Sequence, residues 1–232
     1  MNGEHRQSPI VSLRFYNAGG GIQRDSLLGM TLTLAVGRPT LADRIFSRKL
    51  VTDIVLVASG AALVSLFAQL TVPMYPVPMT GQTLAVLLVG ATLGALRGII
   101  SLSLYAVLGI VGLPVFSDAS SGFGIIAGPT GGYIIGFILS AGLVGWLAQR
   151  QWDHRILGAL ASFVAGTVAT FAIGLPWLAV VLDLDLAQTL QFGLWPFLVG
   201  GLVKAALGAG IIRLAWHGVK RADERAKLAD SE

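Results

Sequence analysis

Lys204 is the residue whose position most suggests chemistry, because it stands ten residues into an otherwise apolar segment, 194–216. At a rise of about 1.5 Å per residue, it lies roughly 15 Å along a helix, too deep for its amine to reach water easily. An ionisable side chain at such a depth is a functional-site candidate. We therefore predict that Lys204 meets an anionic group of a substrate. The alternative is a lysine that backbone carbonyls or water satisfy.

Few other side chains could perform chemistry within the apolar segments. All twelve acidic residues lie outside the middle of these segments, and Asp53 alone enters one, near its end. His5, His154 and His217 also lie outside, there is no cysteine, and no lysine follows a glycine as an ATP-binding P-loop requires. The sequence therefore predicts no enzyme, no metal site and no cofactor. The sequence also disfavours an intramembrane enzyme. It disfavours a proton-coupled carrier as well, because such a carrier usually needs a carboxylate or histidine within the membrane.

Two stretches rich in proline and glycine, 73–82 and 112–133, carry uncharged polar and aromatic side chains. Prolines restrict the backbone and lower the entropy lost on binding, and the second stretch is long enough to fold over a bundle as a lid. This mixture favours a pocket for a compact, partly apolar ligand with an amide-like head, although tight membrane turns have a similar composition. With Lys204, the candidate substrate-binding residues are Thr80, Gln82, Tyr105, Phe116, Thr130, Gly132 and Tyr133.

The composition indicates that lipid is the natural solvent of the chain. Of its 232 residues, 54% are hydrophobic and 12% are charged, whereas about 25% are charged in soluble domains. A soluble core could not bury so much apolar surface. The net charge of +4 comes from basic residues in short segments beside the apolar ones. It therefore predicts an orientation in the bilayer rather than binding to nucleic acid.

Six apolar segments are predicted to cross the bilayer, which gives an all-α polytopic membrane protein. Arg97 divides one apolar block in two, because a lone arginine at a helix centre costs roughly 2.5–3.5 kcal/mol, and we expect it in a tight turn. Pro176 is expected to kink the fifth span. The predicted spans are residues 50–71, 80–96, 98–115, 131–148, 157–182 and 194–216.

Basic residues alternate along the chain in a way that orients these spans. Lysine and arginine precede the first span, occur between the second and third and between the fourth and fifth, and follow the sixth. The loops near 72–79, 116–130 and 183–193 hold none. By the positive-inside rule, both termini are predicted to be cytoplasmic. Four tryptophans near the helix ends suit interfacial anchors: Trp146, Trp152, Trp195 and Trp216.

The ends of the chain are expected to be separate from the bundle. Residues 1–45 are polar and mixed, and their one apolar run, 27–36, is too short to cross about 30 Å of hydrocarbon. We expect them to form a poorly ordered extension, with Met30 as an alternative start. Residues 46–217 are predicted to form the six-helix substrate-binding domain, and 218–232 a cytoplasmic polar tail.

Pairs of small residues four positions apart let helices approach closely. They predict packing inside the bundle, or, at Ala58 and Ala62 in particular, docking of a partner membrane protein. The pairs are Ala58/Ala62, Gly90/Gly94 and Gly132/Gly136.

Three motifs carry a family resemblance: PVPMTGQT at 76–83, GIVGLPVF at 109–116 and GPTGGY at 128–133. In this order and at this spacing they resemble the BioY family, the biotin-specific S-components of energy-coupling-factor (ECF) transporters. The resemblance covers about residues 50–216 and leaves the N-terminal extension outside.

The resemblance implies a substrate-capture subunit in a prokaryotic cell (inner) membrane. Such a subunit binds biotin from outside and works with a transmembrane coupling protein and cytoplasmic ABC-type ATPases; an S-component for a different vitamin is the alternative. Ala58 and Ala62 match the position of the family's small-residue motif, which contacts the coupling protein. Family members usually carry an aspartate three residues before the lysine of the last helix. Here that residue is Gly201, so the biotin carboxylate or water is left to satisfy Lys204.

Overall fold

The computed structural model describes residue 34 and residues 38–229, without the side chain of residue 226. These residues belong to one compact unit, 32–232. Most of the predicted N-terminal extension, with Met30, lies outside the described residues. The regular secondary structure of the described part is helical except for a short antiparallel hairpin, β1 (Thr71–Val72) and β2 (Met79–Thr80).

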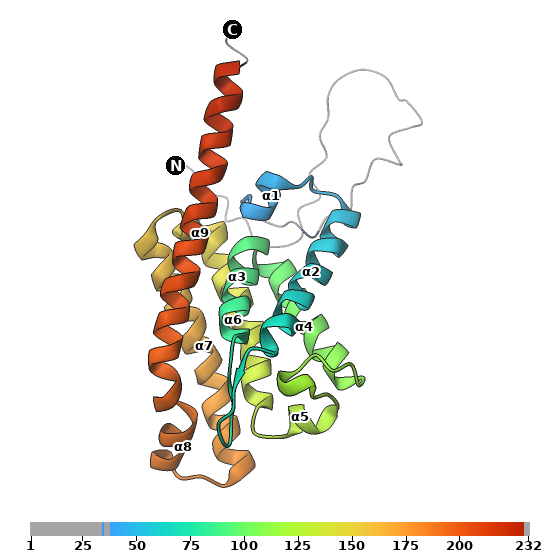
Figure 1. Ribbon diagram of the computed structural model, residues 1–232, viewed down its shortest axis with the longest axis vertical. Coiled ribbons are helices and arrows are strands. Elements are labelled where there is room, and N and C mark those ends of the chain that lie inside the picture. The colour runs from blue at the N-terminus through green and yellow to red at the C-terminus, as the bar shows by residue number, and fades with distance from the viewer. Residues whose placement is uncertain (1–33, 35–37, 230–232) are drawn as a thin grey trace, which may run out of the picture. The chain divides into compact units, whose positions relative to one another are not determined.

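Six helices correspond to the six predicted spans (Figure 1). Within the described part of the chain, four of them, α2, α6, α7 and α9, are long and apolar enough to cross a membrane, whereas α3 and α4 are shorter. α7 runs without interruption through Pro176, and the kink expected there stays a prediction. The six helices are α2 (Leu50–Ala68), α3 (Gln82–Leu93), α4 (Ala95–Ile110), α6 (Gly131–Gln149), α7 (Ile156–Leu182) and α9 (Trp195–Ala229).

Short helices fill segments that we expected to be loops or tails. α5 (Phe123–Ala127) lies between α4 and α6, and α8 (Leu186–Gly193) lies between α7 and α9. Single turns of 3₁₀ helix, η2 (Ser117–Ala119) and η3 (Trp152–His154), bend the connections. α9 continues as a helix to Ala229, beyond the boundary at residue 217 where a polar tail was predicted.

The prediction that Arg97 occupies a turn is wrong, because the break between the two helices comes three residues earlier, at Gly94. Gly94 has a positive φ of 86°, which favours glycine. A Cβ there would also stand 3.0 Å from side-chain atoms of Thr40 and Gln149. Arg97 therefore lies in the first turn of α4, and it is 1% exposed.

A helix within the predicted extension helps to bury Arg97. In α1 (Leu41–Ile45), Asp43 accepts a hydrogen bond from Nη1 of Arg97 at 2.8 Å. Asp53 of α2 accepts one from Nη2. Leu41 is 6% exposed, so the ordered unit begins before residue 46, where the predicted boundary lay.

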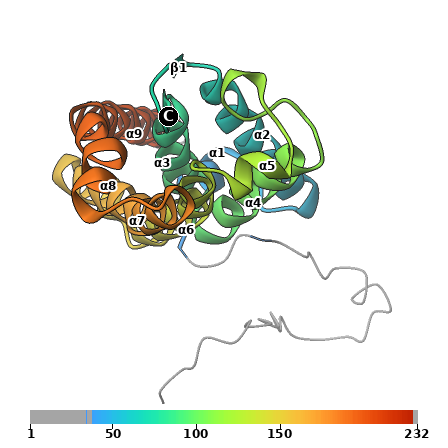
Figure 2. The same ribbon diagram turned by 90° about the horizontal axis from the view of Figure 1, so that it is seen from below.

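Gly90 of α3 and Gly136 of α6 pack inside the unit, as the first of the two interpretations predicted. Figure 2 shows α3 near the centre of the described helices, with α6 and α7 along one side. A Cβ at Gly90 would stand 2.7 Å from the carbonyl oxygen of Ala141 in α6. One at Gly136 would stand 2.7 Å from the carbonyl oxygen of Thr170 in α7. These glycines therefore allow the helix backbones to approach closely.

Trp216 is buried rather than interfacial, which corrects one of the four predicted anchors. It is 4% exposed, and its indole nitrogen donates a 2.6 Å hydrogen bond to Asp153 in η3. Burial raises the pKa of the Asp153 carboxyl to about 6, although the indole hydrogen bond opposes the shift. By contrast, Trp146, Trp152 and Trp195 are 44%, 48% and 59% exposed.

Candidate functional site

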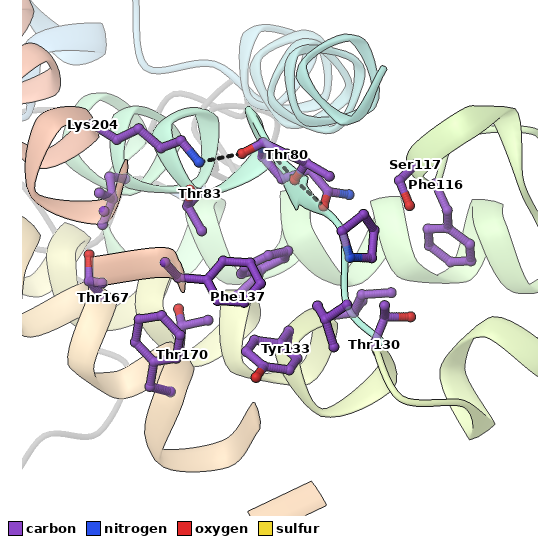
Figure 3. A pocket seen from close by; sticks show the side chains of 18 of the residues that line it. Thr80, Thr83, Phe116, Ser117, Thr130, Tyr133, Phe137, Thr167, Thr170 and Lys204 are labelled. Carbon is purple, nitrogen blue, oxygen red and sulfur yellow. Dashed lines mark hydrogen bonds between the residues drawn. The ribbon is translucent and has the colours of Figure 1, made fainter. Parts of the chain in front are cut away.

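A cavity lies where the hairpin meets the ends and middles of several helices (Figure 3). β2 and the start of α3 form one wall, α6 and α7 form another, and α9 closes one side. Six of the eight predicted binding residues line it: Thr80, Gln82, Phe116, Thr130, Tyr133 and Lys204. The sequence motifs therefore converge on one site, although they are far apart in the chain.

Lys204 points into this cavity from α9, and its amine donates a hydrogen bond to the backbone carbonyl of Thr80 (Figure 3). None of the ion pairs between described residues includes it. Gly201, one turn earlier on the same helix, also lines the cavity. The lysine thus presents a positive charge that a backbone carbonyl satisfies in part and no described carboxylate neutralises.

Gln82 is held at the cavity wall by neighbours on both sides. Its Oε1 accepts a 2.8 Å hydrogen bond from the hydroxyl of Thr80, and its Nε2 donates to the hydroxyl of Tyr105. Tyr105 is fully buried behind it and does not line the cavity. The ring of Tyr105 meets that of Phe116 edge to face, with centroids 5.4 Å apart. Tyr105 therefore orients two lining residues instead of contacting the space itself.

Gly132 also lies outside the cavity lining. A Cβ there would stand 2.2 Å from Cβ of Trp177, so this glycine allows α6 and α7 to pack. The indole nitrogen of Trp177 donates a 3.0 Å hydrogen bond to the carbonyl of Gly128. The GPTGGY motif thus contributes two lining residues, Thr130 and Tyr133, and its glycines shape the start of α6.

Tyr133 joins the cavity to an aromatic group on α7 and α9. Its hydroxyl donates a 3.0 Å hydrogen bond to the carbonyl of Gly193 at the end of α8. Its ring lies 6.1 Å from Phe171 and 6.3 Å from Phe197, centroid to centroid. These rings give the cavity a broad apolar face, which suits the ring system of a partly apolar ligand.

Several lining residues were not predicted. Thr167 and Thr170 are three residues apart on α7 and face the cavity together, a spacing that places side chains on one helix face. Thr83, at the start of α3, has a buried hydroxyl without a hydrogen-bond partner among the described residues. That hydroxyl can bond to a ligand. The apolar lining residues not predicted include Val77, Ile125, Ile134, Phe137, Phe171 and Phe197.

Ala58 and Ala62 lie apart from this cavity, along a shallow groove between α2 and α4. Both are exposed, and Leu104 and Leu108 form the facing wall. The groove's small side chains would let another helix approach α2 closely. In the described part of the chain, no cluster of three or more histidine, aspartate or glutamate side chains could hold a metal ion.

Comparison with known proteins matches residues 27–221 to the BioY family, so the similarity includes part of the segment that the sequence motifs left outside. Biotin transporter BioY2 of Lactococcus lactis is 33% identical over 71% of this chain and 92% of its own length. Biotin transporter BioY of Rhizobium etli is 34% identical over 68% of this chain and 89% of its own.

A solved structure also resembles the fold. A crystal structure of the S-component for biotin from an ECF-type ABC transporter matches with a TM-score of 0.65 and 26% identity. The match covers 70% of this chain and 89% of that chain. Together with the four apolar helices that are long enough to span a bilayer, these matches make the chain a multi-pass membrane protein. It belongs to the BioY family.

Proposed function

We propose that this protein is the substrate-capture subunit of a biotin uptake system and not an enzyme. The observation that carries the proposal is the cavity itself, which combines a lysine that no described carboxylate neutralises, uncharged hydroxyl and amide groups and an aromatic face. Biotin carries groups that match those of the cavity: a carboxylate, an uncharged ureido head and a largely apolar ring and tail. The named biotin transporters that resemble the chain support the same assignment.

The arrangement of the polar groups suggests how biotin lies. Lys204 and Thr83 are at one end of the cavity, and Ser117 and Thr130 are at the other (Figure 3). We place the carboxylate near Lys204, because a charge-assisted hydrogen bond there is stronger than a neutral one. The ureido head then lies toward Thr130, and the rings of the α7 and α9 aromatics cover the apolar part.

Biotin capture also requires the cavity to widen. Its volume is about 60 Å³, whereas ligand pockets are typically about 300–1,000 Å³. The hairpin loop at 73–78 and the segment containing η2 and α5 border the cavity through Val77, Phe116 and Ile125. Tyr75 and Phe123 in these segments are 88% and 67% exposed. We propose that movement of these two segments admits biotin.

We propose six membrane crossings with both termini cytoplasmic, in a prokaryotic inner membrane. The alternation of basic residues along the chain supports this orientation. Because the sequence has no P-loop, the energy for inward release comes from cytoplasmic ABC-type ATPases through a transmembrane coupling protein. The α2–α4 groove with exposed Ala58 and Ala62 is the proposed docking surface for that coupling protein.

Equilibrium binding of labelled biotin to the purified protein tests the assignment. We expect saturable binding that unlabelled biotin and desthiobiotin reduce and lipoate reduces much less, because lipoate has the carboxylate and apolar tail but no ureido head. Absence of saturable binding, or stronger competition by lipoate, would refute it. Mass spectrometry of any ligand that copurifies distinguishes biotin from a different vitamin.

A further inference from the structure

A second hollow, the α7–α9 groove, lies on the side of the ligand cavity. It is lined by residues between 164 and 176 of α7, by Leu194 in front of α9, and by residues between 197 and 205 of α9. Among the described residues that line it, Thr167 is the one with a polar side chain. Its volume is about 470 Å³. The groove is therefore a site for an apolar occupant.

The groove and the ligand cavity share part of one wall. Thr167, Phe171, Phe197 and Gly201 line both spaces. Gly201 has no side chain to thicken this wall, and among the atoms of described residues a Cβ there would meet only Cγ2 of Thr167 within 4 Å, at 3.7 Å. At this point, the two spaces are separated by little more than the α9 backbone and one threonine. Whatever fills the groove therefore supports the wall of the ligand cavity.

The surroundings of the groove indicate its occupant. α7 and α9 are both long and apolar enough to cross a membrane, and the groove lies along the apolar part of each. Val168 and Leu202 on its rim are 59% and 60% exposed, so the groove faces the surrounding medium. In a bilayer that medium is hydrocarbon, which fits an almost wholly apolar lining and gives water few hydrogen-bond partners.

We propose that a phospholipid acyl chain occupies the α7–α9 groove and completes the lateral wall of the ligand cavity. The lipid then acts as a structural component of the binding site, held by apolar contact and not by its headgroup. Biotin affinity depends on whether the groove is filled, because an unsupported wall lets the aromatic face formed by Phe171 and Phe197 move away from the ligand. This last consequence rests on the proposed biotin function; occupation of the groove does not.

Photo-crosslinking tests the occupant directly. The protein is placed in nanodiscs that contain a phospholipid with a diazirine in its acyl chain, and the labelled peptides are identified after irradiation. Ala172 lines the groove but not the ligand cavity, so Ala172→Phe fills the groove with protein. The matched control is Ala161→Phe, an exposed position on the same helix outside both spaces. Wild type and the control should carry adducts on groove residues, and Ala172→Phe should lose them.

Two results of the photo-crosslinking experiment would overturn the proposal. Groove peptides without adducts in wild type would show that something else, such as a second copy of the chain, covers the groove. Equal labelling of wild type and Ala172→Phe would show that the lipid lies elsewhere. Neither result depends on biotin, so this arm decides the proposal even if the protein binds no biotin and the proposed function fails.

Biotin binding tests the shared wall. In nanodiscs of short-chain phosphatidylcholine, the wild type and Ala161→Phe should bind biotin several-fold more weakly than in long-chain phosphatidylcholine. Ala172→Phe should bind it equally in both, because protein replaces the lipid. A wild-type dissociation constant that does not change with chain length, or an identical change in all three proteins, would overturn the proposed role of the lipid.

Discussion

The guanidinium of Arg97 donates a hydrogen bond to the carboxylate of Asp53, and the two side chains are 1% and 0% exposed. Its other amino group donates to Asp43. One buried cation therefore ties α4 to both α2 and α1. Charges removed from water in this way are tolerated only when they are paired and hydrogen-bonded, so each partner depends on the others.

Replacing Arg97 should destabilise the protein strongly. Arg97→Gln removes the guanidinium that pairs with both Asp53 and Asp43, and removal of one partner from a buried ion pair costs about 3–5 kcal/mol. We expect a loss of that order in the free energy of unfolding, measured by denaturant titration in detergent. The control is Arg48→Gln, since Arg48 also pairs with Asp43 but its side chain is 34% exposed; we expect about 1 kcal/mol or less. Equal losses would contradict this account.

Asp153 should make stability depend on pH in the direction opposite to that of an ordinary salt-bridged carboxylate. Burial raises its pKa from 3.8 to about 6 in the folded protein, so the folded state binds the proton more tightly than the unfolded state. The resulting stabilisation is complete below about pH 3.8 and is lost as the pH rises through about 6.

Asp153→Asn keeps an acceptor for the indole of Trp216 and removes the titration. The melting temperature of Asp153→Asn should therefore exceed that of the wild type at pH 7.5. The difference between the two proteins should be smaller at pH 5. The check is a series of thermal melts across that range in one detergent. A constant difference between the two proteins at every pH would show that Asp153 has an ordinary pKa.

Lys204→Met should weaken biotin binding while retaining most of the apolar bulk of the side chain. A hydrogen bond to a charged group contributes about 1.5–3 kcal/mol, which corresponds to a roughly 10- to 150-fold rise in the dissociation constant. Lys220→Met, at an exposed position further along α9, is the matched control and should bind biotin as the wild type does. Unchanged binding by Lys204→Met would remove the lysine from the site.

A bulky residue in the α2–α4 groove should separate capture from transport. Ala62→Trp fills the proposed docking surface, so we expect uptake of labelled biotin by cells to fall to background while biotin binding to the purified protein is retained. Ala206→Trp adds the same side chain at an exposed position on α9 and should leave both activities intact. If Ala62→Trp supports normal uptake, the coupling protein docks elsewhere.

Biotin should change the distance between the two segments that border the cavity. Because the chain has no cysteine, Tyr75→Cys and Phe123→Cys can be combined and spin-labelled without further changes. Both positions are exposed, so the labels should not block the cavity. We expect pulsed electron paramagnetic resonance to give different distance distributions with and without biotin. Identical distributions would argue that biotin enters by another route.

The sequence predicted the binding site best where a residue type is rarely found in that kind of segment. Lys204 was identifiable because a lysine deep in an apolar segment is costly, and the structure places it in the cavity with Thr80 and Gln82. The proline- and glycine-rich motifs were also identifiable. Their glycines, such as Gly132, turned out to pack helices, a role that motif position alone does not distinguish from ligand contact.

Features that depend on long-range pairing could not be predicted in the same way. Asp43 and Arg97 are 54 residues apart, and Asp43 stands in a polar segment that looks like an extension until its partner is known. The helix α8 has only 8 residues, too short for a clear apolar pattern. Thr167 and Thr170 had a readable spacing, but many threonines in such helices merely bond to their own backbone, as these two also do.

The short helix α3 bears on the distance that a captured solute still has to travel. Its 12 residues cover about 18 Å, while the hydrocarbon layer is about 30 Å thick. The polar group formed by Thr80 and Gln82 stands at the end of α3 that the proposed orientation turns outward, and Gly94 ends the helix on the other side. In the proposed orientation, a solute bound beside Gln82 has therefore already passed part of the permeability barrier. The proposed partner subunits would then need to open a path through little more than half of it.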